Sequence, residues 1–155
     1  MKIIPLKHCP DFAHQLAAWH EREWRHLYRD WDREVALRGF QSEPHDGRLP
    51  QTLLALDEKR LVGSVSLVFN DLPGREDLNP WVASFYVVEE ARGHGVGGQL
   101  LAAAEELLRA QGIQQGFLFT ETAQRFFEKH GWRGFESADA NSHPVLIMTK
   151  QLAAP

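Results

Sequence analysis

The chain has 155 residues, 43% of them apolar and 25% charged, and a formal net charge of -4. This composition suits a single domain over residues 1–155 that builds its core without metals or disulfides. The negative balance disfavours nucleic acid as a partner, and no apolar run approaches the length of a membrane span. A lone cysteine, Cys9, and the lack of a signal-peptide pattern predict a cytoplasmic protein.

The apolar periodicity predicts strands and helices that alternate along the chain. Strands are expected at Lys2–Leu6, Thr52–Leu56, Leu61–Phe69, Trp81–Val88, Phe117–Thr120, Trp132–Glu136 and Val145–Gln151. Helices are expected at about Asp11–Tyr28, at Asp32–Arg38, from Val96 to a stop at Gly112, and at Thr122–His130. The strand–helix–strand order around the third helix implies one parallel pair with a right-handed crossover, within a mixed α/β (α+β) fold.

The strongest functional signal is the loop between strand Trp81–Val88 and the helix that follows it. Glycines at positions 93, 95, 97 and 98 let a ligand approach the backbone closely. The helix directs its free N–H groups and its positive dipole end at this loop, and Arg92 adds a fork of donors; both favour phosphate. A tight turn alone would need one glycine, so four within six positions favour a phosphate-binding loop.

Two other phosphate-binding loops are excluded by context. Gly93, Gly95 and Gly98 match the G-x-G-x-x-G pattern of dinucleotide-binding folds, but that pattern belongs in an early strand–helix–strand unit. Here hairpin strands precede it, and strand Phe117–Thr120 ends without an acid until Glu121. No Gly-Lys-Ser/Thr follows the glycines, so the loop is not a P-loop either.

The run Arg92-Gly93-His94-Gly95-Val96-Gly97 resembles the R/Q-x-x-G-x-G/A motif of the GNAT superfamily of acetyl-CoA-dependent N-acetyltransferases. Ala123–Trp132 is similar to the A-x-x-F-Y-E-K-x-G-F segment of the same family, and Pro80–Ala83 with Leu118–Thr120 resembles a largely uncharacterised bacterial branch. Glu89 replaces the proline that usually precedes the loop. The resemblance implies a central, mostly antiparallel sheet of six to seven strands with one parallel pair, flanked by about four helices.

The resemblance also implies that acetyl-CoA binds between the two parallel strands. Its pyrophosphate is expected on the loop N–H groups, and its pantetheine beside the backbone of the first strand. A backbone N–H near Phe85–Val87, at the family's usual bulge, would polarise the thioester carbonyl. Thr120 stands where members often carry a cofactor-touching asparagine. The expected cofactor-binding residues are Val87, Val88, Arg92, Gly93, His94, Gly95, Val96, Gly97, Gly98, Thr120 and Phe127.

The residues expected to act as acid and base depart from the pattern of the family. Phe127 replaces a tyrosine that often protonates the departing thiolate. That role is either dispensable, because a thiol with a pKa of about 8.5 leaves unaided, or it is filled by Tyr86. An ammonium with a pKa of about 10 must lose a proton before it attacks, and the candidate bases are Asp71, Glu89 and His143.

The predicted reaction is direct transfer of an acetyl group from acetyl-CoA to a primary amine of a small molecule, by a monomer or homodimer. A protein N-terminus or lysine is the alternative acceptor, and a non-catalytic acyl-CoA-binding sensor or partner module is the alternative from another class. Ser84 and Tyr86, the first helical hairpin and the acidic loop Asn70–Pro80 are candidate walls of the acceptor site. No metal is expected, because histidines at 8, 14, 20 and 26 spread around a helix rather than converge.

Overall fold

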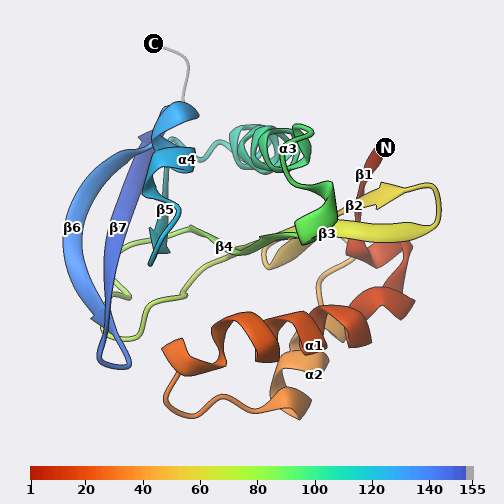
Figure 1. Ribbon diagram of the computed structural model, residues 1–155, viewed down its shortest axis with the longest axis horizontal. Coiled ribbons are helices and arrows are strands. Elements are labelled where there is room, and N and C mark those ends of the chain that lie inside the picture. The colour runs from red at the N-terminus through yellow and green to blue at the C-terminus, as the bar shows by residue number, and fades with distance from the viewer. Residues whose placement is uncertain (153–155) are drawn as a thin grey trace.

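The computed structural model describes residues 1–152 and contains a seven-stranded sheet in the order β1-β2-β3-β4-β5-β7-β6 (Figure 1). Neighbouring strands are antiparallel except β4 and β5, which are parallel. The strands are β1 (Lys2–Pro5), β2 (Gln51–Asp57), β3 (Arg60–Val68), β4 (Trp81–Val87), β5 (Gln115–Thr120), β6 (Arg133–Ala140) and β7 (His143–Gln151). The predicted mixed sheet with one parallel pair is confirmed.

Four α-helices flank this sheet: α1 (Ala13–Trp24), α2 (Arg33–Gln41), α3 (Val96–Ala110) and α4 (Gln124–Lys129). Figure 1 shows α3 and α4 on one face of the sheet, above it in that view, and α1 and α2 on the other. None of the helices in residues 1–152 is long and apolar enough to cross a membrane. The two faces are called here the α3 face and the α1 face.

Three element boundaries differ from the predictions by three residues or more. The first helix does not run to Tyr28, because α1 ends at Trp24 and the chain continues as a 3-10 turn, η3 (Arg25–Leu27). Helix α2 continues past Arg38, where it was expected to end, and reaches Gln41. Strand β6 extends to Ala140 although most of its residues are exposed, because backbone pairing with β7 rather than a buried face sustains it.

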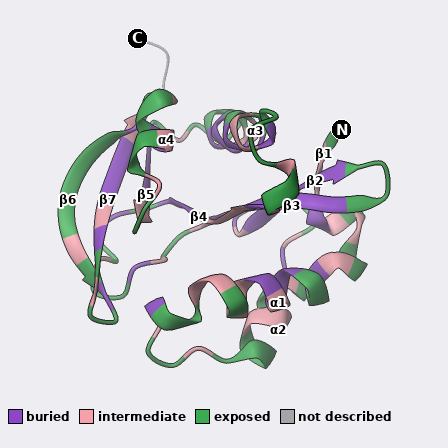
Figure 2. Ribbon diagram, viewed as in Figure 1, coloured by how far each residue is buried: buried purple, intermediate pink, exposed green. Residues whose placement is uncertain are grey.

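Apolar packing on both faces fixes the helices against the sheet (Figure 2). On the α3 face, Leu100, Leu101 and Leu108 are fully buried against β2, β3 and β4. On the α1 face, Leu16 and Trp19 pack against β2 and the start of β3. Each fully buried side chain of this size contributes about 1.5–3 kcal/mol to the free energy of folding. Because such side chains lie on both faces, the sheet has a separate stabilising core on each side.

A buried carboxylate ties α3 to the C-terminal strands. Glu105 accepts hydrogen bonds from Trp132 Nε1 (3.1 Å) and Lys150 Nζ (2.7 Å). Lys150 also donates to the carbonyl of His130, at the end of α4 (2.8 Å). Because a buried charge is tolerated only when it is paired and hydrogen-bonded, this cluster holds α3, α4 and β7 in one fixed arrangement.

Candidate active site

A cavity of about 800 Å³ opens where the two parallel strands separate. Strands β4 and β5 pair only at Trp81 and Phe117, near the beginning of β4. Beyond that point no ladder closes the sheet, and the cavity reaches both of its faces. Residues of the glycine loop and α4 line it on the α3 face, while α1, η3 and Asp71 line it on the α1 face.

The four glycines of the loop serve two different purposes. Gly93 and Gly95 have positive φ angles of 81° and 84°, and a Cβ on either would meet nothing within 4 Å. These two positions therefore need glycine for backbone conformation rather than for space. Gly97 and Gly98 have ordinary angles, but a Cβ there would lie 3.1 Å from Phe126 and from His130, respectively. They let α3 pack closely on α4.

The first turn of α3 offers unpaired backbone donors to the cavity. Gly95 is the N-cap and has no side chain with which to cap the helix. The first intrahelical bond runs from the N–H of Gln99 to the carbonyl of Gly95 (3.1 Å), so the N–H groups of residues 96–98 precede it. Such groups, together with the positive end of the helix dipole, favour a phosphate. The cationic residues Arg92 and Lys129 also line the cavity.

Strand β4 carries a bulge where the thioester carbonyl was expected to bind. Ser64 of β3 pairs with Tyr86 and Ser66 pairs with Ala83, which leaves Ser84 and Phe85 opposite a single residue. Ser84 has a positive φ of 50°, an uncommon conformation for a residue with a side chain. The bulge interrupts the two-residue alternation, and Ser84, Phe85 and Tyr86 all line the cavity.

The backbone of β4 beyond the bulge presents Val87, and not Val88, to the cavity. The N–H of Val88 donates to the carbonyl of Val62 (2.9 Å), so it faces β3. Neighbouring strand residues direct their backbone groups to opposite edges, so Val87 faces the gap. There its carbonyl accepts a hydrogen bond from Arg92 Nε (2.9 Å). Val87 and Val88 were both expected to pair with a ligand, but only Val87 faces the gap.

Asp71 lies in the cavity with an environment suited to a base. Burial raises its pKa to about 6, against a hydrogen bond from the Tyr28 hydroxyl (2.6 Å) that acts in the opposite direction. Burial, and then the negative charge of Asp71, raise the pKa of Tyr28 well above its usual value, so Tyr28 remains a donor. A carboxylate with a pKa just below neutral is ionised at pH 7 and still accepts a proton readily.

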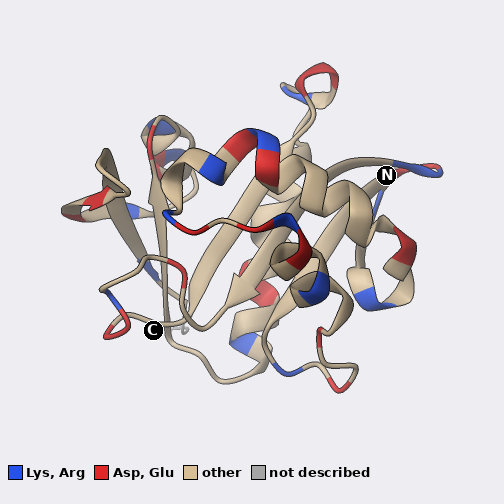
Figure 3. Ribbon diagram, turned by 90° about the horizontal axis from the view of Figure 1, so that it is seen from below, with Lys and Arg blue, Asp and Glu red and all other residues tan. Residues whose placement is uncertain are grey.

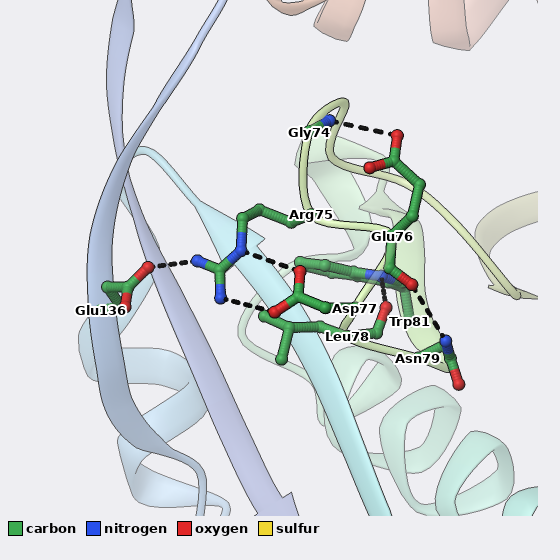
Figure 4. Close-up of polar contacts among 8 residues, drawn as sticks. All are labelled: Gly74, Arg75, Glu76, Asp77, Leu78, Asn79, Trp81 and Glu136. Atoms are coloured by element: carbon green, nitrogen blue, oxygen red, sulfur yellow. Dashed lines mark hydrogen bonds and ion pairs between the residues drawn. The ribbon is translucent and has the colours of Figure 1, made fainter.

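The loop that carries Asp71 directs its other acids elsewhere (Figure 4). Arg75 pairs with Asp77 (3.1 Å) and with Glu136 of β6, which ties the loop to the sheet. Glu76 accepts a hydrogen bond from the N–H of Gly74 (3.2 Å). Of the acids in this loop that were expected to face the acceptor, only Asp71 therefore does so.

Tyr86 lies at the boundary between this cavity and a smaller one of about 590 Å³. Its hydroxyl accepts a hydrogen bond from Arg22 Nη2 (3.1 Å), and its ring packs against Trp19 with centroids 4.9 Å apart. The guanidinium carbons of Arg22 and Arg92 each lie 5.6 Å from the ring centroid, within cation–π range. The hydroxyl keeps its own hydrogen to donate.

Phe127 and Thr120 line the cavity, but both also have structural contacts. Phe127 is 5% exposed and packs edge-on against Phe85 and Phe126, with centroids 5.6 and 5.2 Å apart. Thr120 Oγ1 accepts a hydrogen bond from the N–H of Ala123 (2.9 Å), where α4 begins. Its hydroxyl hydrogen is left for another acceptor.

Three other expected residues do not line the cavity. Glu89 is exposed in the 3-10 turn η4 (Glu89–Ala91) and borders only the smaller cavity. His143, at the beginning of β7, packs edge-on against His26, with ring centroids 4.9 Å apart. His94 is exposed and lies outside the lining. Their place in the sequence therefore did not predict whether they line the cavity.

The structure adds lining residues that the sequence did not single out. Glu23, Trp24 and Tyr28 line the α1 face of the cavity, and Lys129 and His130 line the α3 face. The first helical hairpin was expected as a candidate wall of the acceptor site, but without these individual residues. Within residues 1–152 no group of three or more His, Cys, Asp or Glu side chains is placed to hold a metal ion.

The sequence profile of the acetyltransferase (GNAT) family matches residues 13–132. The chain belongs to the GNAT acetyltransferase family. This GNAT protein is an acyltransferase, and the co-substrate of the family is acetyl-CoA. The glycine loop and the open strand pair fit that ligand, because unpaired N–H groups, Arg92 and Lys129 border a gap lined by β4.

Solved structures share the fold of this GNAT protein over nearly its whole length. An aminoglycoside 6'-N-acetyltransferase in complex with coenzyme A is 18% identical, with a TM-score of 0.76 and coverage of 100% of this chain and 99% of that one. The aminoglycoside 6'-N-acetyltransferase of Enterococcus faecium is 17% identical, with a TM-score of 0.72 and the same coverage. A GNAT acetyltransferase of Staphylococcus aureus is 18% identical, with a TM-score of 0.71 and coverage of 98% and 99%. None of the curated protein sequences matches the chain.

Proposed function

We propose that the protein transfers the acetyl group of acetyl-CoA to a primary amine of a small molecule, with Asp71 as the base. One observation carries this proposal: a single cavity joins the phosphate-binding loop on the α3 face to Asp71 on the α1 face, through the gap between β4 and β5. Cofactor and acceptor can then enter from opposite faces and meet beside the bulge of β4.

The cofactor is held mainly by the backbone. The N–H groups of residues 96–98 bind the pyrophosphate, and Arg92 and Lys129 contribute positive charge. Along the gap, Val87 offers its backbone to the pantetheine. The N–H of Val87 faces the same gap and donates to the thioester oxygen, on which negative charge develops as the carbonyl is attacked.

On the α1 face, Asp71 accepts a proton from the ammonium of the acceptor, and Tyr28 holds the carboxylate in place. The amine nitrogen then forms a bond to the thioester carbon and releases its second proton to water, and the carbon–sulfur bond breaks with its electron pair on sulfur. The thiolate leaves and is protonated by Tyr86 or by water. Phe127 cannot donate a proton, but a thiolate is a good enough leaving group that the reaction proceeds without it.

A small amine is favoured over a protein as the acceptor because side chains enclose the acceptor side of the cavity. Trp24 and Leu27 line the cavity from the α1 face beside Tyr28. Two neighbours in fold are named for acetylating aminoglycosides, which are small molecules. A protein terminus or lysine is the alternative acceptor, and a CoA-binding sensor without turnover is the alternative activity.

The test is release of free thiol from acetyl-CoA by the purified protein in the presence of a panel of amines. We expect amine-dependent release together with a rise in melting temperature on adding CoA, since a ligand that binds only the folded state stabilises it. NAD is the control for the other interpretation of the glycine pattern, and we expect no shift with it. A CoA shift without thiol release from any amine or peptide would identify a sensor.

A further inference from the structure

We infer that the acceptor carries a second cationic nitrogen, and that Glu23 recognises it while Asp71 serves the amine that reacts. This inference rests on the proposed function and specifies its substrate class as diamines and polyamines. Glu23 is then a residue that determines specificity, rather than a residue that takes part in the chemistry.

Charge is segregated along the cavity. Strands β4 and β5, which form its middle, contain no charged residue. Figure 3 shows charged residues of the chain gathered mainly on helices and loops. Of the two cationic residues of the lining, Lys129 belongs to α4 on the α3 face, and Arg92 is held at the side of the gap by the Val87 carbonyl and the Tyr86 ring. The charged residues that line the cavity from the α1 face are both acids, Glu23 and Asp71. A negative cavity end with apolar walls attracts a cation and raises its local concentration.

Not every acid of the lining is free to bind a ligand. Glu121 is also in the lining, but it already forms a 2.7 Å ion pair with His26. On α1, Glu21 pairs with Arg33 (3.6 Å), and Arg22 donates to Tyr86. Glu23 is half-buried in the cavity wall and forms no ion pair or side-chain hydrogen bond within residues 1–152.

Aromatic side chains beside Glu23 suit the same ligand. Trp24 and Tyr28 line the cavity next to it and are both half-buried. Aromatic faces attract an ammonium group and also pack against the methylene chain that joins two amines. Asp71 lies against Tyr28, so a diamine that spans from Asp71 to Glu23 would cross this aromatic surface.

The experiment compares kcat/KM for α,ω-diamines of increasing length with kcat/KM for the monoamines of the same length. If Glu23 forms a hydrogen-bonded charge pair with the second ammonium group, kcat/KM of the wild type should be about ten- to a hundredfold higher for the best diamine than for the matching monoamine. Glu23→Gln should reduce this preference by about tenfold or more. Glu21→Gln is the matched control on the same helix, outside the lining, and should keep the wild-type preference.

The outcomes separate this inference from the function on which it rests. Thiol release with no preference for diamines at any length, or an unchanged preference in Glu23→Gln, would overturn the second cationic site and leave the acetyltransferase intact. No thiol release with any amine would overturn the proposed function itself. If Glu23→Gln misfolds, the comparison of diamines with monoamines on the wild type still decides the question.

Discussion

The α3 face of the cavity is built from one stretch of chain, Arg92–Gly98, and the helix packed on it, whereas the α1 face is assembled from distant segments. Tyr28 and Asp71, which touch there, are 43 residues apart, and His26 and Glu121 are 95 apart. The first face binds through backbone groups whose conformation glycine permits. The second acts through side chains that only the tertiary fold brings together.

The two faces also differ in how they respond to pH. Backbone N–H groups do not titrate, so the cofactor side offers the same donors over a wide pH range. Asp71 has its pKa raised to about 6 by burial, so the acceptor side changes charge near neutrality. We therefore expect CoA binding and turnover to respond differently to substitutions and to pH.

The largest effect on CoA affinity is expected from Gly95→Leu, which tests whether the α3 face alone binds the cofactor. A side chain at a φ of 84° strains the N-cap of α3 and stands beside the pyrophosphate. CoA affinity, measured by calorimetry, should fall by about a hundredfold, equivalent to about 2.7 kcal/mol. Gly112→Leu is the control: its φ is 77° and its surroundings are equally open, but it lies at the far end of α3. Equal loss of CoA affinity in both variants would contradict the assignment.

Tyr28→Phe should move the pH profile while leaving CoA binding unchanged. The hydrogen bond from Tyr28 lowers the pKa of Asp71, so its removal raises that pKa above 6. The base is active when ionised, and the acid limb of kcat/KM should therefore shift to higher pH, with a loss of about threefold to tenfold at pH 7. A profile that drops uniformly without shifting would show that Tyr28 acts only in packing.

His20 tests whether the α1 face limits acid stability. Burial lowers its pKa to about 4, and its Nδ1 accepts a hydrogen bond from Trp31 Nε1 (2.8 Å). The unfolded chain binds a proton on this group below about pH 6.5, so its contribution to stability is lost as the pH falls from there to about 4. Over that pH range, the melting temperature of His20→Gln should fall less than the melting temperature of the wild type. Parallel curves for the two proteins would rule out this contribution.

The smallest effect is expected from Phe127→Tyr. Phe127 packs among phenylalanine rings at the edge of the cavity. If the added hydroxyl reaches the cavity, turnover at neutral pH stays the same or rises modestly, because the thiolate already leaves well. Turnover and melting temperature should be measured together. A large fall in both would mean that the hydroxyl is buried without a partner, which costs about 1–3 kcal/mol.

The sequence was sufficient for the sheet and for the glycine loop, because both depend on local patterns. Short apolar runs identified β2 to β5, and the run 92–98 identified the turn before α3. Helix α1 was predicted too long, since the irregular backbone at Trp24 leaves no trace in the apolar spacing.

The acceptor side was only partly predictable. Asp71 was one of three candidate bases, and nothing in the sequence ranked it above Glu89, because burial and the contact with Tyr28 exist only in the folded chain. Glu23 was indistinguishable from the other charges of a helix that is mostly solvated. Trp24 and Tyr28 had the spacing of core residues, and they do pack on the core, but at its edge with the cavity.

The most direct test of the account is Asp71→Asn, assayed for CoA binding, amine-dependent thiol release and melting temperature. We predict wild-type CoA affinity, a loss in kcat/KM of about 10²–10⁴-fold, and a higher melting temperature above pH 6. The last effect follows because the pKa of Asp71 is raised from 3.8 to about 6 in the folded protein, so its ionised form destabilises the wild type at higher pH. Turnover close to that of the wild type would show that Asp71 is not the base, and a loss of CoA binding would show that the two faces of the cavity are not independent.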